Sequence, residues 1–330
     1  MESFCAAPCR PTRPWRLYPT MITLAHGLRF ADLYTIDGAN RIDRLFVDHL
    51  RAADAALGDQ FDAARAAPDT LETKTEAALL IAVAPHLEDF IAQLFGIAPE
   101  VQALESRHHE LAPLFAVKRQ FVQRKAANAY KAEIAAGFDG PVLQATLEEK
   151  LGVPLPGPAG ELAFATAVTR WLQDEVANEA ALDVAARYAA WALHTPARRA
   201  AAQGGVLFRA PRKLDYMKLV PLQAVSTGGV TAWKLPEDHA LRRREGFALT
   251  DHGMDLAGGL DQAHYCIWCH EQGKDSCAHG LREKKPIEGE APFRKSPFNV
   301  TLAGCPLEER ISEFNKLRAE GWPLGALAMM

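Results

Sequence analysis

Apolar residues recur every three or four positions over most of the region from residue 22 to residue 196, which is the spacing of one face of an α-helix. The positions between them are filled mainly by Ala, Leu, Glu, Gln, Lys and Arg, which favour helices. Pro85 predicts the start of a new turn, because proline has no amide hydrogen to continue a helix. We therefore predict a succession of amphipathic helices, with buried faces that include Ile42, Leu45, Phe46, Leu50, Leu80, Val83, Leu87, Ile91, Phe164, Val168, Trp171 and Leu172.

The stretch from Lys118 to Lys131 keeps the helical spacing of apolar residues but is rich in basic side chains. Charged side chains on a helix usually form its solvated face, and we predict that role here. A docking surface for nucleotide phosphates or for a partner is the alternative that the same residues allow.

Shifts in composition divide the chain into four segments. Residues 1–20 are rich in Pro and Arg without periodicity, and we interpret them as a disordered or spurious extension. Residues 21–197 form the predicted all-helical domain. Residues 198–257 are richer in Gly, Pro and β-branched residues, and they predict an irregular connector with short strands or extended arms at residues 204–208 and 228–233. Residues 258–330 hold four of the six cysteines and form the last segment.

Composition narrows the class of protein. The 330 residues include 37 Lys and Arg against 41 Asp and Glu, so the formal net charge is −4. A general nucleic-acid binder needs a large positive footprint, so we expect no nucleic-acid partner. The longest strongly apolar run, from Ala77 to Ala84, is far shorter than the roughly 20 residues that cross a bilayer. Without a secretory signal pattern, we expect a cytoplasmic protein that has no membrane partner and can form a homo-oligomer.

The late cysteines carry the candidate chemistry. Cys266 and Cys269 are separated by two residues, Cys277 follows after seven more, and Cys305 after a further 27, directly before Pro306. Clustered thiols in a large chain without a signal peptide indicate metal binding or redox chemistry. Thiolate is a soft ligand that suits iron–sulfur clusters or zinc. We therefore predict Cys266, Cys269, Cys277 and Cys305 as the ligands of a cofactor or metal, and we identify no catalytic residue.

The residues after Cys305 predict a helix. Pro306 suits a first helical turn, Leu307, Ile311 and Phe314 share one face, and Gly321 can end the helix. A thiol at a helix N-terminus ionises more readily, which favours Cys305 as a ligand.

Two other interpretations of the cysteines remain open. A structural zinc site could use Cys266, Cys269, Cys277 and His279 as its four ligands. The cysteines could also be unrelated core residues, although the polar residues His264, His270, Gly273 and Lys274 around them are typical of a loop.

Two stretches resemble a known family. Gly304-Cys305-Pro306-Leu307, with Ile311, Glu313 and Asn315, is similar to the signature of the iron–sulfur domain in the glutamate synthase small subunit and in dihydropyrimidine dehydrogenase. The run from Tyr265 to Cys277 resembles the N-terminal iron–sulfur region of bacterial pyridine nucleotide-disulfide oxidoreductase-like proteins.

The resemblance implies a mostly α fold, in which the helical domain is followed by an α-helical ferredoxin-like domain. It implies an electron-transfer module of a flavin-linked NAD(P)H oxidoreductase. A [4Fe–4S] cluster would bind Cys266, Cys269 and Cys277, and Cys305 would serve a second cluster. FAD and NAD(P)H would bind downstream domains of the same polypeptide, which this chain lacks, so the resemblance implies a fragment. The alternative function is a non-enzymatic helical scaffold with a structural zinc site.

Overall fold

The computed structural model describes residues 23–195, 205–210, 214–236, 246–247, 249, 253–285, 289 and 291–330. The predicted extension at residues 1–20, with Cys5 and Cys9, lies outside this range. The described part is mostly helical, as the hydrophobic periodicity predicts, and its only named sheet has two strands. The longer elements are α1 (Ile36–Ala53), α2 (Ala55–Ala66), α3 (Thr73–Phe95), α4 (Ala98–Val117), α7 (Gly140–Leu151), α8 (Pro158–Trp171), α9 (Glu179–His194), β1 (Gln223–Thr227), β2 (Val230–Lys234), α11 (Leu256–Ala263), α13 (Ile311–Glu320) and α14 (Pro323–Met329).

Short helices join these elements. A π-helix, Lys118–Ala126, continues α4, and the short helices α5 (Ala127–Ala129) and α6 (Ala132–Ala135) follow it. Single turns of 3₁₀ helix and the four-residue α12 complete the set: Phe30–Tyr34, Pro68–Thr70, Leu172–Asp174, Cys269–Gln272 and Ser276–His279.

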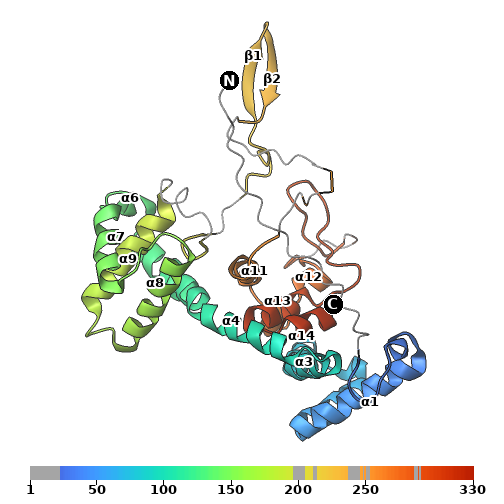
Figure 1. Ribbon diagram of the computed structural model, residues 1–330. Helices are drawn as coiled ribbons and strands as arrows, with labels where there is room; N and C mark the ends of the chain where they lie inside the picture. Colours follow the sequence, from blue (N-terminus) through green and yellow to red (C-terminus); the bar gives the residue numbers. More distant parts are fainter. Residues whose placement is uncertain are drawn as a thin grey trace, which may run out of the picture.

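The helices enclose separate hydrophobic cores. The first is formed by α1, α2 and α3, where Phe46, Leu50 and Phe90 are buried. The second lies at the other end of α4, where the π-helix packs with α7, α8 and α9 around Phe121, Phe164 and other buried residues. Figure 1 shows α1 and α2 at one end of the molecule and α7–α9 at the other, with α4 running between them.

The last helices pack against the first ones. α14 and α13 contact α3, and Leu317 and Ala326 form a small third core with Ala84. Glu88 on α3 is buried, and its carboxylate accepts hydrogen bonds from Leu324 N at 2.9 Å and Gly325 N at 3.0 Å. The carboxylate thus satisfies free amides at the start of α14 and anchors the C-terminal helices to the N-terminal ones.

The helix α3 differs from the sequence prediction at Pro85, and its apolar composition is notable. Pro85 lies inside this helix and does not begin a new turn. By length and composition α3 is apolar enough to cross a membrane, but its contacts with α1, α2, α4, α13 and α14 also fit a core helix of a soluble protein.

The connector is tied to the second core through one buried carboxylate. Val206, Leu207 and Phe208 are buried in a turn and do not form the predicted strand. Glu161 Oε2 accepts hydrogen bonds from Val206 N at 2.7 Å and Leu207 N at 2.8 Å. The other predicted extended segment does contain a strand, because β2 pairs antiparallel with β1. This hairpin stands away from the helices (Figure 1).

Candidate functional site

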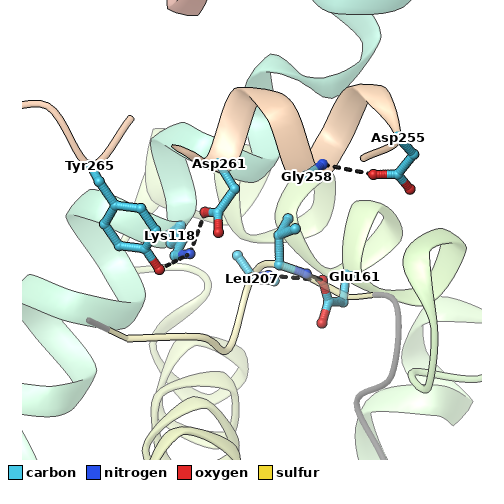
Figure 2. A network of polar contacts seen from close by, with 8 residues as sticks. Lys118, Glu161, Leu207, Asp255, Gly258, Asp261 and Tyr265 are labelled. Atoms are coloured by element: carbon cyan, nitrogen blue, oxygen red, sulfur yellow. Dashed lines mark hydrogen bonds and ion pairs between the residues drawn. The ribbon is translucent and has the colours of Figure 1, made fainter. Parts of the chain in front are cut away.

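The segment that carries Cys266 begins where α11 is anchored to the helical body. Asp255 caps α11 by accepting a hydrogen bond from Gly258 N at 2.8 Å. Asp261 then forms an ion pair with Lys118 at 2.5 Å, and both side chains are nearly inaccessible to solvent, at 3% and 6% exposure. Figure 2 shows Lys118 between Asp261 and the hydroxyl of Tyr265, which lies 3.5 Å from the ammonium nitrogen.

The predicted solvated face of the basic stretch is therefore wrong for its first residue. Burial lowers the pKa of Lys118, while the hydrogen bond and charge of Asp261 oppose that shift. Arg119 places its guanidinium 4.9 Å from the centre of the Trp268 ring. These contacts fix the cysteine segment from both sides.

His264 adds an aromatic contact to this attachment. Its ring stacks on Phe115 with centroids 4.6 Å apart, and burial lowers its pKa to about 4. The imidazole is therefore neutral at pH 7 and packs as an aromatic side chain.

Two of the predicted ligands converge on one hydroxyl. Ser312, the second residue of α13, is completely buried. Its Oγ lies 3.9 Å from Cys269 Sγ and 4.0 Å from Cys266 Sγ. The same oxygen lies 2.7 Å from Nδ1 of His270, another buried residue. α13 therefore closes one side of the space into which Cys266 and Cys269 project.

Local backbone geometry produces this convergence. Trp268 has φ = 51°, an uncommon left-handed conformation for a residue other than glycine, and it reverses the chain between the two cysteines. Gly273, with φ = 66°, ends the 3₁₀ turn that begins at Cys269. Ser276 N then points to Cys269 Sγ at 3.5 Å, so the next loop returns to the same sulfur.

Cys277 lies within electrostatic reach of this group. Burial raises the pKa of its thiol, and the negative charges of Cys269, Asp275 and Cys266 raise it further. Cys305 is brought beside it by the backbone, because Cys305 N donates a hydrogen bond to Cys277 O at 2.8 Å. The four predicted residues thus gather in one region of the fold. Within the described residues, however, no group of three or more His, Cys, Asp or Glu side chains is arranged to hold a metal ion.

The helix predicted after Cys305 is corrected at its start. The helix expected from Pro306 begins at Ile311, so Cys305 does not lie at a helix N-terminus. Gly321 does end that helix, with φ = 98°. His279 Nδ1 lies 4.0 Å from Glu308 Oε1 on a half-exposed side chain, and its contact is with this carboxylate.

Buried acids next to the cysteines were not predicted from the sequence. Glu313 is completely buried and Asp275 is 3% exposed. Neither Glu313 carboxyl oxygen has a hydrogen-bonding partner of normal geometry, and neither does Asp275 Oδ2, although Asp275 Oδ1 caps α12 through Ala278 N. Burial, together with the nearby charge of Asp275, raises the pKa of Glu313, so its carboxyl retains a proton more readily than an exposed one. Asp275 directly before Ser276 is a pattern typical of a helix cap, and this pattern is the sequence signal that could have identified Asp275.

Comparison with known proteins changes the interpretation of the chain. Residues 24–96 match the family model described as "RP005 N-terminal alpha-helical domain". The chain is also 29% identical over 307 residues to "Uncharacterized protein RP005" of Rickettsia prowazekii (strain Madrid E), covering 90% of this chain and 98% of that protein. No solved structure matches.

These matches overturn the resemblance drawn from the cysteine motifs. The prediction of the iron–sulfur region of a pyridine nucleotide-disulfide oxidoreductase-like protein, related to the glutamate synthase small subunit, is wrong. The assignment as an iron–sulfur, electron-transferring oxidoreductase is wrong with it: neither match is to such a family, and the described cysteines are not arranged as cluster ligands. The expected ferredoxin-like domain and the flavin and nicotinamide domains rested on the same resemblance.

Proposed function

We propose that the chain is a non-enzymatic helical scaffold whose last segment is held together by a zinc ion bound to Cys266, Cys269, Cys277 and Cys305. The observation that carries the proposal is that Cys266 and Cys269 lie near the buried hydroxyl of Ser312, while a backbone hydrogen bond joins Cys305 to Cys277. The segment between the cysteines has little regular structure of its own, and a metal clip supplies the stability that a small loop-rich segment lacks.

The donor set and its surroundings suit a soft divalent cation. Four thiols are a standard donor set for structural zinc, which binds them as thiolates. Ionised thiols so close together repel one another, and a bound divalent cation removes that penalty. The described thiols are not arranged around one point, so binding requires their side chains to move.

Zinc would supply cross-linking and no redox chemistry, because the ion has a single stable oxidation state in proteins. The residues of this chain perform the structural work. Ser312 and His270 hold α13 against the Cys266–Cys269 turn, and the Cys305–Cys277 backbone bond joins the last loop to it.

Metal analysis of the full chain tests the proposal. The protein is purified without an affinity tag under nitrogen, and its zinc, iron and acid-labile sulfide are measured per chain. We expect about one zinc and no stoichiometric iron or sulfide. The variants C266S and C277S should each lose the zinc. The matched control C5S/C9S removes the two cysteines that the proposal does not use, and it should retain the zinc.

Three outcomes would contradict the proposal. A protein with four freely reactive late thiols and no zinc contradicts the proposal. So does a Cys266–Cys269 disulfide in the purified protein, or iron and sulfide in equal amounts.

A further inference from the structure

A large polar cavity lies beside the segment that carries Cys277. It has a volume of about 1040 Å³ and is lined by residues 273–276 and 279–284, by Arg294 and by Thr73 of α3. This volume is at the upper end of the range for small-molecule sites. None of the four late cysteines lines it.

Backbone hydrogen bonds between three stretches of chain build the wall of this cavity. Glu283 N bonds to Pro292 O at 2.9 Å, Arg294 N bonds to Leu281 O at 2.8 Å, and Leu302 N bonds to Arg294 O at 2.9 Å. An isolated β-bridge joins Arg282 to Phe293. Arg282 and Arg294 are therefore brought to the cavity wall by adjacent, paired stretches of backbone.

Four cations line the cavity, namely Lys274, Arg282, Lys284 and Arg294. Within the part of the chain that the structure describes, none of the four forms an ion pair with a carboxylate. The lining includes two acids, Asp275 and Glu283, so cations outnumber acids there by two. This concentration of unpaired positive charge occurs in a chain whose formal net charge is −4.

We infer that this cavity binds a small, multiply charged phosphate compound of the polyphosphate or nucleoside triphosphate class. Two guanidinium groups match phosphate oxygens in pairs, and two ammonium groups add point charges. A ligand with two or more negative charges balances this excess of cations, and linked phosphates carry such charge in a compact form. The hydroxyl groups of Ser276 and Thr73 can add neutral hydrogen bonds at the same cavity.

The concave shape favours a free small molecule over a nucleic acid or a membrane surface. Long polyanions bind along extended basic surfaces, whereas these cations line one bounded cavity. The inference is independent of the zinc site.

Isothermal titration with tripolyphosphate and, separately, with ATP tests the inference on the full chain. We expect saturable binding of one molecule per chain that weakens as salt rises. R282Q/R294Q should bind at least about tenfold more weakly, since each lost charged hydrogen bond costs roughly that factor. The control K150Q/R170Q makes the same change of charge on exposed faces of α7 and α8, and it should bind like the wild type.

Three further readouts complete the experiment. Circular dichroism checks that the variants are folded, and zinc analysis of each sample checks that the phosphates have not removed the metal. Tighter binding of ATP than of tripolyphosphate would show that the base contributes. Absence of saturable binding, equal weakening by both double variants, or binding only to oligonucleotides or anionic vesicles would overturn the inference.

Discussion

The buried ion pair between Lys118 and Asp261 allows the sharpest test of how the cysteine segment is attached. Lys118 begins the π-helix, Asp261 lies on α11, and the two charges are 2.5 Å apart with almost no solvent access. Removing one partner of such a pair leaves an uncompensated buried charge, which costs about 3–5 kcal/mol. We expect K118M and D261L each to lower the free energy of unfolding by this amount.

The double variant K118M/D261L measures the coupling energy between the two charges. It replaces both charges with apolar groups, and such replacements are often neutral or stabilising. We therefore expect it to differ from the wild type by less than about 2 kcal/mol, so that the coupling energy exceeds about 3 kcal/mol. The exposed pair Lys125–Glu175, at 2.7 Å, is the control, and K125M should cost less than about 1 kcal/mol.

Urea unfolding followed by circular dichroism at pH 7 measures the free energies of unfolding of the wild type and of these variants. The denaturant slope must stay constant for the comparison to hold. D261L also carries a pH signature. Burial already lowers the pKa of Lys118, and loss of Asp261 lowers it further, so the unfolded state binds more protons and D261L should regain stability as pH rises. Single variants that each cost less than about 1 kcal/mol, or a double variant that costs their sum, would refute the reasoning.

Three further changes test other contacts. Glu161→Ala removes the acceptor of two buried amides and should destabilise the fold by about 2–4 kcal/mol, with earlier proteolysis of residues 205–210 as the readout. Burial raises the pKa of Glu88, so the stability that this carboxyl contributes is full below about pH 4 and is lost as pH rises. The free energy of unfolding of E88Q, measured in urea, should therefore rise relative to that of the wild type between about pH 4 and 7. A difference between the two proteins that stays constant with pH would contradict this. Gly280→Ala places a Cβ 2.6 Å from the Phe293 ring at φ = 82° and should lower the thermal midpoint more than Gly152→Ala, which has φ = 70° and open space; equal losses would show that the clash is relieved.

Helical periodicity predicted much of the first two hundred residues correctly because burial there follows local spacing. Phe46 and Leu50 are buried as their positions on α1 indicate, and Phe164 and Val168 are buried on α8. Spacing could not reveal which helices meet. The packing of α13 and α14 against α3 joins residues more than two hundred positions apart, and it depends on Glu88 reaching the amides of α14.

α13 shows where amphipathic reasoning failed at the candidate site. The sequence assigned Leu307, Ile311 and Phe314 to the buried face, yet Leu307 is 77% exposed. Ser312 and Glu313 are completely buried in their place. The buried residues of α13 thus include polar ones as well as Leu317, and a hydrophobic pattern alone carries no sign of that.

The cysteine spacing suggested the wrong family, and a common site for the late thiols stays a prediction. The short separation of Cys266 and Cys269 places both sulfurs near Ser312, and a backbone hydrogen bond brings Cys305 to Cys277. Iron–sulfur and zinc proteins use similar short cysteine spacings, so the pattern could not distinguish the cofactor.

Zinc K-edge X-ray absorption on the purified full chain tests the central claim most directly, because it reports the atoms bound to the metal. The account predicts a first shell of sulfur only, with about four atoms at about 2.3 Å. A shell of oxygen and nitrogen, or a sample without zinc in which the four late thiols remain free, would contradict it.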